Sequence, residues 1–97
     1  MNSIAYEIKE LLVTSGKTLA TAESITAGHL QSMLTSMSGA SDFFQGGITA
    51  YQRSIKVKLL DVDDLFAREH NCVHEVIAVQ MAMGALSMFE SDYAIST

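Results

Sequence analysis

The sequence has few of the residues that build disulfide frameworks, rigid turns and basic surfaces. Of its 97 residues one is cysteine, and none is proline or tryptophan. The single Cys72 excludes an internal disulfide framework and is typical of a reducing cytoplasm. No apolar run approaches the roughly 20 residues that span a membrane, and residues 1–10 have acids early and no apolar signal core. We therefore expect a cytoplasmic protein with no export segment and no membrane segment.

Positive charge is also scarce. Six Lys and Arg residues stand against eleven Asp and Glu residues, so the formal net charge is −5. A protein that binds the phosphate backbone of nucleic acids needs a clustered basic face, and only Arg53, Lys56 and Lys58 form a local group here. We expect no nucleic-acid partner, whereas a small anionic ligand near this group stays open.

What the sequence does contain is enough apolar residues for one ordered core. Hydrophobic residues make up 48% of the chain, and a chain of this length forms a single small domain. No linker, low-complexity tract or internal repeat interrupts it. We therefore expect residues 1–97 to form one domain.

Helical and strand patterns alternate along this domain. Apolar spacing and stop residues predict helices over 3–15, 24–38, 55–60, 63–70 and 74–89, and strands over 18–22, 43–51 and 93–96. The glycine pair inside the second strand predicts a bulge or a close backbone approach. Such alternation predicts an α/β fold, a layered sheet with flanking helices.

Ser24 lies where the first predicted strand passes into a helix. A serine there most often caps the helix, which is worth about 1 kcal/mol. The same position suits a nucleophile, because free N–H groups around Ile25 and Thr26 could stabilise an oxyanion. A neutral serine needs a base, and no Ser-His-Asp arrangement is evident. Tyr51 and Lys56 could meet Ser24 where two strands end, so both interpretations stay open.

Several motifs follow one another in a fixed order. The stretch "TLATAESITAG" is followed by "MSGASDFFQGGITAYQRSIKVKLLDV", with Lys56 five residues after Tyr51. Together they resemble the C-terminal domain family of the competence/damage-inducible protein CinA, whose enzymatic members are nicotinamide mononucleotide amidohydrolases. The resemblance covers nearly the whole chain, from the first predicted helix to Thr97.

The resemblance implies a reaction and a set of site residues. The carboxamide of a small-molecule nucleotide substrate, nicotinamide mononucleotide, would be hydrolysed to nicotinate mononucleotide and ammonia. Ser24 would attack, Lys56 would be the base, and Tyr51 would relay protons or stabilise the intermediate. Substrate contacts would come from Thr26, Gly46 and Gly47, although a bulge alone also explains the two glycines. No cofactor and no metal is expected.

The chain departs from the family pattern at three positions. Ile25 stands where the family has Cys, Ala27 where it has Gly, and His74 where a Ser begins the long helix. We expect His74 to lose that helix cap. His70 lies four residues before His74, but Asn71 is expected to interrupt the helix between them, so the two rings need not share a face.

The chain also stops early in the family pattern. Family members continue with a T-G-I-A-G-P loop, whereas this sequence stops at "AIST". We expect a C-terminally truncated, incomplete domain whose strand 93–96 is an exposed edge, with a homo-oligomer or another chain pairing there. The retained Ser24, Tyr51 and Lys56 favour an amidohydrolase. The missing half favours the alternative, an inactive truncated paralogue that acts as a binding or interaction module.

Overall fold

A three-stranded parallel sheet organises the chain. A computed structural model describes residues 3–97, with strands in the order β2-β1-β3. The strands are β1 (Leu19–Glu23), β2 (Phe44–Thr49) and β3 (Tyr93–Ser96). The helices are α1 (Ser3–Ser15), α2 (His29–Leu34), α3 (Arg53–Leu60), α4 (Asp64–Glu69) and α5 (Glu75–Phe89), with a short 3₁₀ turn η1 (Ala40–Asp42). The predicted α/β fold, a layered sheet with flanking helices, is confirmed.

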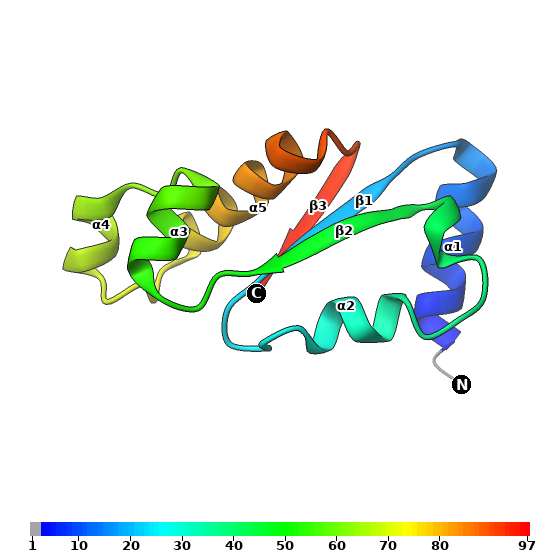
Figure 1. The fold of residues 1–97 in the computed structure, drawn as a ribbon, viewed down its shortest axis with the longest axis horizontal. Helices are drawn as coiled ribbons and strands as arrows, with labels where there is room; N and C mark the ends of the chain where they lie inside the picture. Colours follow the sequence, from blue (N-terminus) through cyan, green and yellow to red (C-terminus); the bar gives the residue numbers. More distant parts are fainter. Residues whose placement is uncertain (1–2) are drawn as a thin grey trace.

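Helices cover both faces of the sheet (Figure 1). On one face, β1 contributes Ala22 to a core completed by α3, α4 and α5, including Leu60 and Ile77. On the other face, Leu19 packs with Leu34 and Phe43, against partly buried residues of α1 and α2. All five residues of β1 are consequently buried, as expected for the central strand of a parallel sheet.

The glycine pair of β2 lies beside a bulge. Leu19 is opposite Phe44 and Ala20 is opposite Gly46, so Gln45 is an extra residue in the ladder. A Cβ on Gly46 would lie 2.8 Å from the Phe89 ring, and a Cβ on Gly47 would overlap the side chain of Gln31. The predicted bulge is confirmed, and both glycines are required by close packing inside the protein.

The predicted helix over 24–38 is wrong at both ends. In the structure α2 begins at His29 and ends at Leu34. The chain from Ser24 to Gly28 is a turn, in which Ala27 and Gly28 have φ of 51° and 99°. Left-handed residues do not continue an α-helix, so the apolar spacing of this segment did not produce one long helix.

The other predicted helices are confirmed to within two residues of their ends. Gly16 follows α1 with φ of 69°, and Asn71 follows α4 with φ of 52°. The expectation that His74 would not cap α5 is wrong, because its Nδ1 accepts from the N–H of Val76 at 3.1 Å. No helix within residues 3–97 is long and apolar enough to cross a membrane.

Candidate active site

The carboxyl ends of the three strands meet at one edge of the sheet. Ser24 directly follows β1, Tyr51 lies two residues after β2, and Thr97 directly follows β3. In open parallel sheets, this edge is where ligands bind. A cavity of about 380 Å³ lies here, and Ser24, Tyr51, Lys56 and Thr97 all contribute to its lining. The structure thus brings the three predicted catalytic residues to one cavity.

Lys56 reaches this cavity from α3 with its side chain almost completely buried. The residue is 3% exposed, and its Nζ donates a hydrogen bond to the carbonyl oxygen of Tyr51 at 2.7 Å. The Tyr51 residue itself is 68% exposed. Tyr51 therefore holds the lysine head group through its main chain, while its phenol ring remains accessible at the cavity mouth.

Ser24 is held by its main chain and not by a helix. Its N–H donates to the carbonyl oxygen of Thr97 at 3.0 Å, and its carbonyl oxygen accepts from the N–H of Ala27 at 3.1 Å. Because α2 begins five residues later, after Gly28, the helix-cap interpretation of Ser24 is wrong. Its hydroxyl has no hydrogen-bond partner among residues 3–97 and is available for chemistry at the cavity.

The side chain of Thr26 and the two glycines, which were expected to contact substrate, do not line this cavity in the described chain. Thr26 is turned toward Glu23, whose carboxylate accepts from its hydroxyl at 2.7 Å. Gly46 and Gly47 approach Phe89 and Gln31 on opposite faces of the sheet. None of the three predicted substrate contacts is part of the cavity lining in the described chain.

The connection between α4 and α5 covers the cavity, which the sequence patterns did not indicate. Asn71, Cys72 and His74 line it, and the first two have left-handed φ of 52° and 59°. The rings of His70 and His74 do lie together, with centroids 4.7 Å apart, and both contact the Phe66 ring. Residues 3–97 contain no group of three or more metal-ligating side chains.

Glu23 is the functional candidate that sequence reasoning missed. It ends β1 directly before Ser24 and is 0% exposed. Burial raises the pKa of its carboxyl, but hydrogen bonds from the Thr26 hydroxyl and from the N–H groups of Gln31, Leu30 and Gly28 outweigh burial and hold that pKa below its ordinary value. The available signal in the sequence was an acidic residue between the predicted strand and Ser24.

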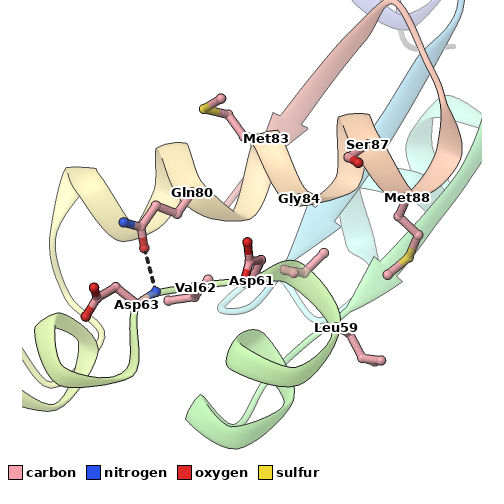
Figure 2. A pocket seen from close by; sticks show the side chains of 10 residues that line it. Leu59, Asp61, Val62, Asp63, Gln80, Met83, Gly84, Ser87 and Met88 are labelled. Atoms are coloured by element: carbon pink, nitrogen blue, oxygen red, sulfur yellow. Dashed lines mark hydrogen bonds between the residues drawn. The ribbon is translucent and has the colours of Figure 1, made fainter.

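A larger cavity of about 830 Å³ lies between α5 and the link from α3 to α4 (Figure 2). Leu59, Met83 and Met88 line it together with Asp61, and the Gln80 side chain accepts from the N–H of Asp63 at 2.9 Å. None of the predicted site residues contributes to it. Because all three predicted catalytic residues line the smaller cavity, that cavity is the better active-site candidate.

Comparison with known proteins identifies similar sequences. The profile of the family described as "CinA C-terminal domain" matches residues 1–97. A "CinA-like protein" of Picosynechococcus sp. is 45% identical over 93 residues, which are 96% of this chain and 22% of that protein. One from Trichodesmium erythraeum is 45% identical over 96 residues, 97% of this chain and 22% of that protein. The chain thus spans about a fifth of these relatives' length.

Solved structures share the fold. The competence damage-inducible protein A of Klebsiella pneumoniae superposes with a TM-score of 0.93 at 28% identity, covering 97% of this chain and 58% of that one. The competence/damage-inducible protein of Agrobacterium tumefaciens superposes with a TM-score of 0.93 at 29% identity, covering 97% and 57%. The chain therefore spans somewhat more than half of these structures.

Proposed function

The chain belongs to the CinA C-terminal domain family, and from this premise we propose that it hydrolyses the carboxamide of nicotinamide mononucleotide. The products are nicotinate mononucleotide and ammonia. The observation that carries the proposal is the convergence of Ser24, Tyr51 and Lys56 on one cavity at the carboxyl edge of the sheet. Amide hydrolysis requires a nucleophile, a proton carrier and oxyanion donors, and this edge offers candidates for each.

The first half of the proposed reaction forms an acyl-enzyme. Ser24 Oγ attacks the carboxamide carbon while its proton passes to Nζ of Lys56, which acts as the base. The N–H groups of Ile25 and Thr26, which have no acceptor among residues 3–97, stabilise the oxyanion. The proton on Lys56 then passes to the leaving nitrogen, the C–N bond breaks, and ammonia departs.

The second half of the reaction returns the enzyme to its starting state. Water attacks the ester carbon while Lys56 accepts its proton, and the Ser24 oxygen leaves and is reprotonated. The hydrogen bond from Lys56 Nζ to the Tyr51 carbonyl oxygen supports a fixed lysine position through both halves. The exposed Tyr51 phenol is suited to relay protons at the cavity mouth.

The experiment is ammonia release from nicotinamide mononucleotide by the purified chain. We expect Ser24→Ala and Lys56→Met each to lower kcat by at least about 10³-fold, because each removes an essential proton-transfer partner. Lys58→Met is the matched control, because Lys58 is an exposed lysine on the same helix and should leave kcat unchanged. No ammonia release by folded wild-type protein, or full activity in Ser24→Ala, would overturn the proposal.

A second candidate function is supported by the edge of the sheet. We propose that β3 pairs with a strand of a second copy or of another chain, so that the domain acts as an interaction module. Within residues 3–97, β1 is the only strand beside β3, and the Tyr93 and Ile95 residues of β3 are 54% and 36% exposed. An accessible strand edge with apolar side chains favours such pairing. We further propose a cytoplasmic location, supported by the lone Cys72.

A further inference from the structure

The Glu23 carboxylate is bonded to one short segment of chain. Its Oε1 accepts from the Thr26 hydroxyl at 2.7 Å and from the N–H groups of Gly28 and Leu30 at 3.1 and 2.7 Å. Its Oε2 accepts from the N–H of Gln31 at 2.8 Å. Within residues 3–97 no lysine, arginine or histidine pairs with it. A fully buried acid is thus compensated by four donors from a turn and the helix start that follows.

The N–H groups from Ser24 to Gln31 can be accounted for one by one. Three bond to main-chain carbonyl oxygens and three to the Glu23 carboxylate: Ser24, Ala27 and His29 in the first group, and Gly28, Leu30 and Gln31 in the second. Only the N–H groups of Ile25 and Thr26 have no acceptor in the part of the chain that the structure describes. These are the two residues that directly follow the candidate nucleophile.

We propose that Glu23 is a positioning residue for the hydrolysis: its carboxylate holds the turn after β1 so that the N–H groups of Ile25 and Thr26 stay free for the oxyanion beside Ser24. This inference rests on the proposed function.

The Thr26 hydroxyl contacts both Glu23 and Thr97 but has a single proton to donate. Because that proton is donated to Glu23, the close contact between the hydroxyls of Thr26 and Thr97 requires Thr97 to donate. The Ser24 N–H also donates to the Thr97 carbonyl oxygen. The Thr26 hydroxyl therefore connects Glu23 to Thr97, the same residue that accepts from the Ser24 N–H.

A glutamine at this position keeps the side-chain shape but removes one acceptor. Its amide oxygen can still accept where Oε1 does, whereas its NH₂ group would face the N–H of Gln31, two donors with no acceptor between them. The turn must shift to relieve this opposition. A shift of about 1 Å beside a reacting centre can lower a rate by about 10²-fold, and it acts on the transition state more than on substrate binding.

The test compares wild type with Glu23→Gln, and uses Glu10→Gln as the control because Glu10 is an exposed acid on α1. With nicotinamide mononucleotide as substrate, we expect Glu23→Gln to lower kcat about 10²-fold with KM changed less than about threefold. Amide hydrogen exchange by NMR should accelerate at least about tenfold at Gly28, Leu30 and Gln31, while the sheet amide of Thr97 keeps its protection. Glu10→Gln should match wild type in both measurements.

Each outcome decides the proposal. A folded Glu23→Gln with wild-type kcat, or with unchanged exchange at Gly28 and Gln31, would overturn it. Should Glu23→Gln not fold, Thr26→Val removes one of the four donors, and an unchanged kcat there would also overturn it. Absence of ammonia release by wild type would instead sink the proposed function, and the exchange measurement would still establish or refute the hold of Glu23 on the turn.

Discussion

At the scale of single residues, Ala27 adopts a left-handed backbone conformation at a position where the resembled pattern has glycine. Ala27 has φ of 51°, a conformation that costs residues with a Cβ roughly 1–2 kcal/mol and costs glycine almost nothing. This angle gives a physical reason for a glycine at this position of the resembled pattern. The predicted helix over 24–38 is incompatible with this left-handed conformation, because every residue inside an α-helix has negative φ.

We predict that Ala27→Gly stabilises the protein by about 0.5–1 kcal/mol, because relief of the left-handed strain exceeds the added flexibility of the unfolded chain. The measurement is the free energy of unfolding from urea denaturation. Ala82→Gly is the matched control, because Ala82 lies inside α5 and the same substitution there should destabilise by about 1 kcal/mol. A destabilised Ala27→Gly would contradict the conformation described for the turn.

At the scale of elements, the crossing of α3 and α5 depends on one glycine. A Cβ on Gly84 would overlap the carbonyl oxygen of Leu60 and lie 2.7 Å from its Cα. Leu60 is the last residue of α3 and is buried. The backbones of the two elements therefore approach closely at Gly84, beside the larger cavity of Figure 2.

We predict that Gly84→Ala destabilises the protein by about 1–3 kcal/mol, because α3 must move away from α5 to admit the methyl group. In an uncrowded helix interior the same change would stabilise the protein by roughly 1 kcal/mol. The sign of the change in the free energy of unfolding therefore tests whether α3 and α5 are in close contact at Gly84. Thermal or urea unfolding provides the measurement. Ser87→Ala, at an exposed position of α5, should change stability by less than about 0.5 kcal/mol.

At the scale of the whole molecule, the open side of β3 is the feature that could join this chain to another. β3 makes its ladder with β1 over residues 93–96, and its other edge has no strand beside it within the described chain. The Tyr93 and Ile95 side chains lie on the face opposite Ala94, which packs toward the α5 core.

We predict that the purified chain self-associates in sedimentation velocity experiments and that Ile95→Lys shifts it toward monomer, because a charge on an accessible strand opposes edge pairing. Leu11→Lys is a suitable control, since Leu11 is a 72% exposed residue of α1 and lies outside the sheet. Wild type that remains monomeric would contradict pairing between two copies of this chain.

The sequence by itself determined most of the elements and the residues worth testing. Periodicity and stop signals located α1, α3, α4, α5 and the three strands, because these features depend on neighbours along the chain. Ordered motifs singled out Ser24, Tyr51 and Lys56. The order of the motifs also predicted substrate contacts at Gly46 and Gly47. In the structure the side chains of Phe89 and Gln31 lie against these glycines, and motif order carries no information about such packing.

Only the tertiary structure decided how the chain runs after β1 and what surrounds Ser24. The turn from Ser24 to Gly28 depends on a buried carboxylate, on two left-handed residues and on Thr97 at the far end of the chain. Hydrogen bonds between residues distant in sequence leave no periodic signal. These hydrogen bonds outweigh the helical spacing of Ala27, Leu30 and Leu34. The free-energy cost of burying Glu23 without donors would exceed the free energy that one more helical turn would contribute.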